Sequence, residues 1–306
     1  MPEKPEAHTP RFLAWLYSTP LQQPVLASLC GIEQEIGASL RPGVDHHVAH
    51  TRLEWWRAEC ARCAAGNPVH PLTRELRDHL ERLAPGSPAN SALAGLSGLV
   101  DAATWDLAGA TFERREELTA YCRRWAAAVI VPVSWGSDAR DGESRRANAA
   151  ADLTGPDTAA DPTGPDVAAD LIALGAALCE LELLGRLDGD ARSGRLRAPL
   201  DELAQAGVAP EALSSPPWPP GLVTLLRARH HALRQQLADA VANLSPQTQQ
   251  RARGVLVWAA LAWQASLRAE RSLPNPPAAS IASAAAANWR AWRAARAAAA
   301  GRLRLG

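Results

Sequence analysis

The fold is decided by the stretch LGAALCELELLGRLDGDARSGRLRAPLDELAQAGV, residues 174–208. Its apolar residues recur every three or four positions up to about Asp188, which is the period of an α-helix. The polar end of this helix then breaks at Gly194. Asp190 follows Arg186 by one helical turn, where a second carboxylate would complete a metal-binding pair. The stretch is therefore either a metal site that has lost one side or simply a polar helix end.

The same helical period continues along the rest of the chain, and strand signals are nearly absent. The one β-branched run, AVIVPVSW at 128–135, is interrupted by Pro132. We therefore expect an all-α protein, with a single helical domain over residues 10–275. The pattern predicts helices at about 10–19, 22–40, 45–65, 70–83, 89–109, 113–135, 167–188, 199–206, 221–243, 246–271 and 278–300.

Residues 137–166 differ from the rest of the chain in composition. The nonapeptide AADLTGPDT (150–158) is followed at once by AADPTGPDV (159–167), and both are rich in Asp, Gly, Pro and Thr. Such a segment buries too little apolar area to offset its ordering entropy. We predict a disordered surface insertion within the helical domain.

Composition argues against several classes of function. The 306 residues include 32 basic and 32 acidic side chains, so we expect no nucleic-acid partner. The five cysteines form no dense framework, which favours a reducing compartment. The N-terminus lacks the apolar core of a signal peptide, and no eighteen-residue window is apolar enough to span a membrane. These features predict a cytoplasmic protein.

The C-terminal segment, residues 278–306, is rich in Ala, Arg and Trp and should form a helix. Trp289, Trp292 and Arg293 belong to a basic, aromatic strip that would suit a lipid interface. The apolar face is mostly alanine, which binds membranes weakly. Two alternatives therefore stay open, packing on the bundle and peripheral contact with the inner face of a membrane.

Two motifs have metal-like spacing. His46 and His50 lie four apart, so a helix would place both on one face. Cys60 and Cys63 have the spacing of a redox or zinc pair. The histidines lack the Glu that follows the first His in zinc proteases, and the cysteines lack a second pair. We therefore favour exposed histidines at a helix start and two buried thiols, and we place Glu59 off the apolar face of the same helix.

The serial order of these pieces resembles the squalene/phytoene synthase family of all-α isoprenoid synthases. The segments that carry the resemblance are Leu53–Arg57, Gly66–Pro71, Leu118–Cys122 and, most strongly, Gly175–Val208. The resemblance covers roughly residues 12–270. It implies an isoprenoid-synthase-type helical bundle around a central cavity.

The family's chemistry depends on two carboxylate clusters on facing helices. These clusters hold Mg²⁺ ions that bridge the diphosphates of two prenyl donors and stabilise the departing pyrophosphate. In this chain LASLCGIEQEIGASLR (26–41) stands in the place of the first cluster, and Glu33 and Glu35 lie on different faces because they are two residues apart. The expected acidic positions hold other residues: Gly37, Ala38 and Arg41.

The second cluster is also depleted. It keeps Asp190 as a possible metal ligand, but Arg186 replaces the leading Asp and Gly189 replaces the acid before the last. Glu182 stands where the family usually has Asn. We therefore expect no cofactor, or Mg²⁺ if the protein is an active enzyme.

The N-terminal segment RFLAWLYSTPLQQPVLASLCGIEQEI (11–36), with RLEWWR (52–57) soon after, is similar to a degenerate branch of the family that includes a mitochondrial complex I assembly factor. The missing acids favour a protein that binds a prenyl or other apolar ligand with altered or lost chemistry. The first alternative is an active Mg²⁺-dependent prenyltransferase that condenses two prenyl diphosphates head to head. The second is a non-enzymatic assembly factor or scaffold, whose protein partners are not predicted.

The resemblance also suggests roles for single residues. In an active enzyme Arg52 and Arg57 would clamp diphosphate, and Tyr121 would be a candidate proton acceptor. The other predicted ligand-binding residues are Arg186, Arg195 and Glu182.

Overall fold

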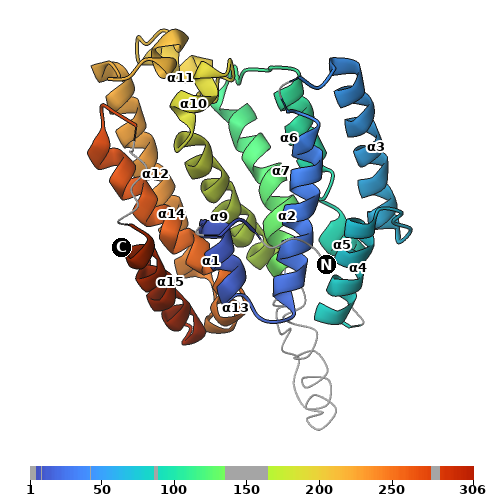
Figure 1. The fold of residues 1–306 in the computed structure, drawn as a ribbon. Helices are drawn as coiled ribbons and strands as arrows, with labels where there is room; N and C mark the ends of the chain where they lie inside the picture. The colour runs from blue at the N-terminus through green and yellow to red at the C-terminus, as the bar shows by residue number, and fades with distance from the viewer. Residues whose placement is uncertain (1–4, 8, 42, 86–88, 135–164, 277–282) are drawn as a thin grey trace.

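The computed structural model describes residues 5–7, 9–41, 43–85, 89–134, 165–276 and 283–306. These residues form helices and no strand, which confirms the predicted all-α class (Figure 1). The first seven helices are α1 (Pro10–Tyr17), α2 (Gln22–Ala38), α3 (His46–Ala65), α4 (Pro71–Leu83), α5 (Ala89–Leu93), α6 (Gly98–Leu107) and α7 (Arg115–Ser134). The others are α9 (Pro165–Leu184), α10 (Leu187–Arg192), α11 (Leu200–Gln205), the 3₁₀-helix η1 (Pro210–Ser214), α12 (Pro220–Asn243), α13 (Pro246–Arg251), α14 (Arg253–Ser272) and α15 (Ser283–Ala299).

Three of the predicted helices are divided in the structure. The predicted helix 89–109 becomes α5 and α6, and the backbone at Gly98, where α6 begins, packs directly on α7. A Cβ at Gly98 would lie 2.6 Å from the carbonyl oxygen of Arg124. The other two divisions fall at Arg186, between α9 and α10, and at Ala252, between α13 and α14. Helical periodicity does not register such breaks, since the apolar positions on either side keep the same spacing.

The helix ends follow local chemistry more closely. Asp45 accepts hydrogen bonds from the backbone N–H groups of His47 and Val48 and so begins α3. Gly66 ends the same helix with a φ of 94°, a left-handed conformation that glycine adopts at little cost. These two residues set the length of α3.

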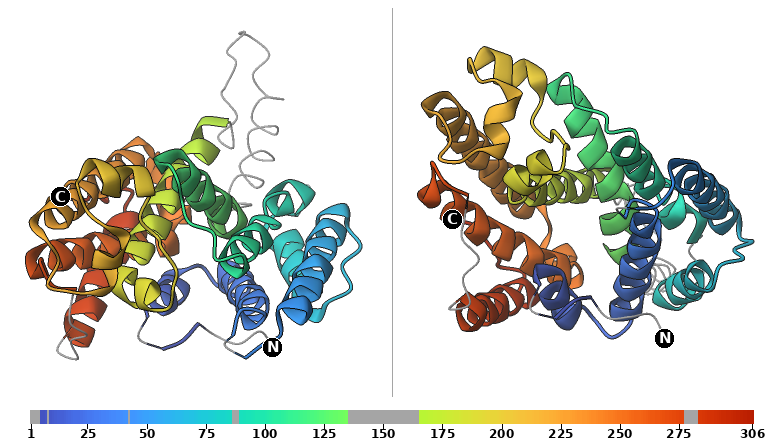
Figure 2. Two further views of the ribbon diagram at one scale, coloured as in Figure 1. Left: turned by 90° about the horizontal axis from the view of Figure 1, so that it is seen from above. Right: turned by 45° about the horizontal axis from the view of Figure 1, so that its top comes forward.

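The helices pack side by side in one bundle. α7 and α9 lie together at its centre, α2 packs on α7, and both α12 and α14 pack on α9. α1 lies between α14 and α2. Figures 1 and 2 show α3 and α4 on one side of the bundle and α15 on the opposite side. The short helices α10, α11 and η1 cover one end, over a small second core.

The C-terminal helix belongs to this bundle. α15 packs against α14, and it buries the alanine face made of Ala291, Ala294, Ala295 and Ala298. Trp289 and Trp292 stack on each other with a centroid distance of 4.9 Å and remain exposed. Of the two alternatives for this segment, the structure shows packing on the bundle.

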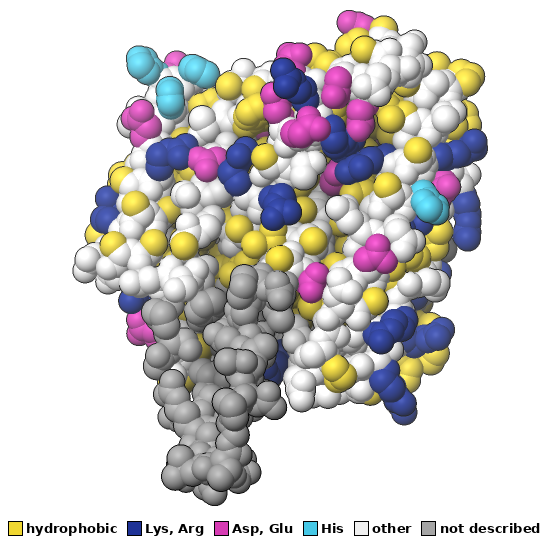
Figure 3. Space-filling view, turned by 180° about the vertical axis from the view of Figure 1, so that it is seen from behind, with side chains coloured by type: hydrophobic (Ala, Val, Ile, Leu, Met, Phe, Trp, Pro, Cys, Tyr) yellow, Lys and Arg dark blue, Asp and Glu magenta, His cyan; other side chains and the backbone are white. Residues whose placement is uncertain are grey.

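Other predictions from sequence have separate outcomes. All five cysteines are buried and unpaired, as expected for Cys60 and Cys63. No helix in the described part of the chain has the length and apolarity needed to cross a membrane. The predicted insertion 137–166 lies outside the described residues, apart from positions 165 and 166, which already belong to α9. Figure 3 shows acidic and basic side chains intermixed over the upper part of the face that it draws.

Candidate functional site

A cavity of about 770 Å³ opens between α1, α2, α9, α12 and α14. One wall is apolar and comes from α14, with Trp258, Ala262, Ala265 and Ala269. Cys30 of α2 also lines the cavity, and burial raises the pKa of its thiol to about 11. The volume lies within the range of pockets that enclose a small organic ligand. A bundle cavity was expected from the resemblance, and the structure contains one.

One guanidinium group joins the two helices that occupy the places of the family's acidic motifs. Arg11 of α1 donates to Glu33 of α2 and, over 2.9 Å, to Glu182 of α9. Its guanidinium also lies over the rings of Trp125 and Trp258, 5.5 and 5.1 Å from their centroids. Burial by itself lowers the pKa of Arg11, but the two carboxylates raise it by more. Arg11 is therefore a fixed cation between two acidic side chains.

Neither Arg11 nor Glu33 was among the site residues predicted from sequence. A signal for Glu33 does exist, because it lies one turn after the buried Cys30 and one turn before the buried Ile36 on the apolar face of α2. Arg11 lies at the start of α1, where a cation is disfavoured by the helix dipole. A charge in such a place indicates a partner elsewhere in the fold, but it does not identify that partner.

The carboxylates that line this cavity do not fit the Mg²⁺-binding clusters of the family. Mg²⁺ is held by several oxygen ligands in octahedral geometry, including carboxylates. Here each helix supplies one carboxylate, Glu33 or Glu182, and both are paired with Arg11. The described residues contain no group of three or more His, Cys, Asp or Glu side chains that could hold a metal ion. This holds for His46 and His50 as well, whose ring centroids are 6.4 Å apart.

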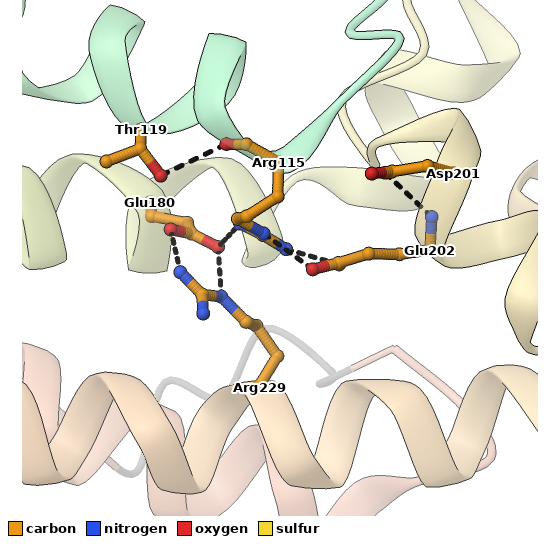
Figure 4. Close-up of polar contacts among 6 residues, drawn as sticks. All are labelled: Arg115, Thr119, Glu180, Asp201, Glu202 and Arg229. Carbon is orange, nitrogen blue, oxygen red and sulfur yellow. Dashed lines mark hydrogen bonds and ion pairs between the residues drawn. The ribbon is translucent and has the colours of Figure 1, made fainter.

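A second ionic cluster lies at a different place on α9 (Figure 4). Glu180 is buried and accepts two hydrogen bonds from Arg229 of α12 and one from Arg115 of α7. Arg115 also donates to Glu202 of α11, from Nε to Oε1 over 2.6 Å. This cluster joins α7, α9, α11 and α12, and each of its charges has an opposite partner, so we assign it to holding the helices together. No pattern in the sequence predicted this cluster, because its members are distant in the chain.

The predicted residues Tyr121 and Asp190 lie close to one buried arginine, outside the lining of the cavity. Arg197 donates to Asp106 over 2.6 Å, and its Nε lies 3.5 Å from Oδ2 of Asp190. Its guanidinium carbon is 5.9 Å from the centroid of the Tyr121 ring. Burial raises the pKa of Tyr121, with a further contribution from Asp106. The tyrosine is therefore a neutral phenol at physiological pH.

The remaining predicted residues are scattered. Arg186 is exposed and lines the cavity together with Glu182. Arg195 is partly buried in the turn after α10, where its backbone N–H donates to the carbonyl of Asp190. Arg52 and Arg57 are exposed on α3, outside the lining, and Arg57 pairs with Asp101 over 2.5 Å. The structure thus brings Glu182 and Arg186 to the cavity and leaves the other predicted residues elsewhere.

Comparison with solved structures identifies the fold as that of the isoprenoid synthases. A dehydrosqualene synthase crystallised with a ligand matches with a TM-score of 0.70, over 94% of this chain and 92% of that chain, at 13% identity. Squalene synthase HpnC from Alicyclobacillus acidocaldarius matches with a TM-score of 0.61, over 86% of this chain and 89% of that chain, at 17% identity. At such identities the likeness establishes the fold alone.

The family follows from the sequence itself. The model of the squalene/phytoene synthase family matches residues 14–293. The chain therefore belongs to the squalene/phytoene synthase family. A comparison with curated proteins gives no match.

Proposed function

We propose that this protein binds a prenyl or other apolar ligand in the cavity and does not carry out Mg²⁺-dependent head-to-head condensation. The observation that carries the proposal is the position of Arg11. Its guanidinium lies between Glu33 and Glu182, the two acidic side chains that α2 and α9 contribute to the cavity. An arginine in this position neutralises the negative charge of the two carboxylates that a metal ion would need as ligands.

The energetic consequence concerns the leaving group. Ionising an allylic diphosphate requires its developing charge to be neutralised, and losing one such stabilising group costs about 3–4 kcal/mol, or roughly 10²–10³ in rate. Arg11 cannot substitute for the metal, because both of its terminal nitrogens already donate to carboxylates. Arg186 is the other arginine in the described lining, and it is exposed to solvent, where its charge is screened. The standard reaction therefore lacks adequate electrostatic support.

The same features are consistent with membership of this chain in the degenerate branch of the family, the one that includes a mitochondrial complex I assembly factor. A bundle that keeps the family fold while its acidic side chains are neutralised internally could act through binding and not through catalysis. Within this proposal the protein resides in the cytoplasm, and the exposed pair Trp289 and Trp292 is a candidate for peripheral contact with a membrane.

The test combines a product assay with a binding assay. We expect purified protein incubated with farnesyl or geranylgeranyl diphosphate and Mg²⁺ to give no presqualene diphosphate, squalene or phytoene by mass spectrometry. Farnesol, added without metal, should quench tryptophan fluorescence, since Trp258 lines the cavity. Ala265→Trp, at an exposed lining position, should weaken this binding at least tenfold at unchanged thermal stability. Formation of a condensation product, or absence of any binding, would refute the proposal.

A further inference from the structure

We infer that the cavity selects an uncharged apolar alcohol, such as a prenyl alcohol, over the corresponding diphosphate. This inference rests on the proposed function, because it assumes that an apolar ligand enters this cavity. It goes further by assigning the chemistry of the ligand's head group. Three features of the described lining carry it, namely its charge, its hydrogen-bonding groups and its apolar wall.

The charge of the lining opposes an anionic head group. The described lining residues include three carboxylates and two guanidinium groups: Glu6, Glu33, Glu182, Arg11 and Arg186. With His230 neutral, they sum to one net negative charge. Arg11 already pairs with Glu33 and Glu182. Arg186, the other arginine of the lining, forms no ion pair among the described residues. A diphosphate would bring several negative charges to a lining that is already negative.

A cationic head group is also poorly matched. Aromatic faces and carboxylates are the groups that attract an ammonium ion. The guanidinium of Arg11 already lies over one face of Trp258, and it also pairs with Glu33 and Glu182. The cavity therefore already contains the cation that these groups would attract.

The lining also contains neutral hydrogen-bonding groups, on α12 and on α14 beside its apolar side chains. The hydroxyl of Ser266 on α14 accepts a hydrogen bond from Arg234 over 3.0 Å and shares a second one with Nδ1 of His230, also over 3.0 Å. A neutral imidazole has one N–H and one acceptor nitrogen, so Nε2, for which the described residues provide no partner, can form one more hydrogen bond in either tautomer. Burial and the nearby Arg234 lower the pKa of His230 to about 4, so the ring is neutral at physiological pH.

An alcohol matches this set of groups. Its hydroxyl group is both a donor and an acceptor, so it can form a hydrogen bond with Nε2 of the neutral imidazole in either tautomer. Its hydrocarbon chain can pack on the apolar side chains of Leu181, Trp258, Ala262 and Ala269. The hydroxyl group adds no charge, so the ion pairs of Arg11 remain intact when the ligand is bound.

The test is a titration of the full chain with four probes that share one carbon skeleton: farnesol, farnesyl diphosphate, farnesylamine and farnesene. Tryptophan fluorescence and calorimetry give the dissociation constants, with and without Mg²⁺. We expect farnesol to bind at least tenfold more tightly than the other three, with no effect of Mg²⁺. Equal or tighter binding of the diphosphate, the amine or the hydrocarbon would overturn the inference. Tight diphosphate binding without product formation would leave the proposed function standing, whereas a condensation product would refute that function itself.

A pair of charge variants tests the electrostatic step. Glu33→Gln removes one negative charge from the lining and frees part of Arg11, so it should strengthen diphosphate binding at least tenfold while farnesol binding changes less than threefold. Glu35→Gln makes the same change two residues away, at an exposed position outside the lining, and should alter neither affinity. Thermal unfolding confirms that both variants are folded. Equal effects of the two substitutions would show that the charge of the lining does not select the ligand.

Discussion

At the scale of single residues, Glu59 shows how a buried charge can organise a turn. It is fully buried on α3, although the sequence pattern places it off the apolar face of that helix. Its Oε1 accepts from the backbone N–H groups of Val69 and His70, over 2.8 and 2.9 Å, and Arg62 pairs with its other oxygen. The carboxylate therefore joins the end of α3 to the turn that leads into α4.

The stability contributed by Glu59 should depend on pH. Burial alone raises its pKa, but hydrogen bonds from Thr73, His70 and Val69 outweigh burial and leave the pKa below the ordinary 4.5. A carboxyl whose pKa is lowered by folding stabilises the protein above its unfolded pKa, and this stability is lost as the pH falls through the lower folded value. We expect urea midpoints of the wild type to include a decrease below about pH 4.5 that Glu59→Gln lacks.

The same substitution should be costly at neutral pH. Glu59→Gln leaves a buried donor with a weaker acceptor, which costs about 1–3 kcal/mol in the free energy of unfolding at pH 7. Glu54→Gln, at an exposed position on the same helix, is the matched control and should change little. If the acid profiles of wild type and Glu59→Gln run parallel, the carboxylate does not contribute in this way.

At the scale of helices, the contact between α7 and α9 sets the position of one side of the cavity. Gly175 of α9 lies directly against α7, where an added Cβ would be 2.6 Å from Cγ1 of Ile130 and 2.7 Å from Cβ of Ala126. Glu182 lies two turns further along α9. A change in the separation of these helices would therefore move the carboxylate relative to Arg11.

Gly175→Ala should be destabilising even though alanine favours helices. The added methyl forces the two helices apart, which costs about 1–3 kcal/mol, whereas the gain in helix propensity is about 1 kcal/mol. Gly189→Ala in α10 is the control, since nothing lies within 4 Å of its added Cβ, and it should be neutral or slightly stabilising. Chemical unfolding of both variants measures the difference, and a Gly175→Ala protein as stable as wild type would show that the contact relaxes freely.

At the scale of the whole molecule, α14 connects the cavity with the C-terminal helix. One face of α14 lines the cavity through Trp258 and Ala262, and the same helix packs against α15. Beyond α15, the side-chain amide of Gln249 bonds with the backbone of Leu303. The C-terminal segment therefore supports the helix that forms the apolar wall.

Substitutions on α15 test this support. Ala298→Glu would bury a charge against the bundle and should lower the free energy of unfolding by more than about 1 kcal/mol, with the loss limited by the ability of a terminal helix to detach. Ala299→Glu adds the same side chain one residue further on, where it is exposed, and should be nearly neutral. Thermal unfolding compares the two. Equal stability would indicate that α15 does not pack on the bundle in solution.

The sequence by itself determined the helical class and the family. Apolar residues repeat at the helical period along almost the whole chain, and the ordered motifs from Leu53 to Val208 resemble one family, whose model matches residues 14–293. Ends marked by local chemistry, such as Asp45 and Gly66, were also readable, because capping depends on residues close in the chain. Local information was sufficient for all of these features.

Only the tertiary structure decided which charges meet. Arg11 is 22 residues from Glu33 and 171 residues from Glu182, yet the three share one cavity. It also decided that Tyr121 and Asp190 lie near Arg197 and that Arg52 and Arg57 remain outside the cavity lining. The physical reason is that periodicity specifies the face on which a side chain lies, whereas its partner depends on how that face packs against helices that are distant in the chain.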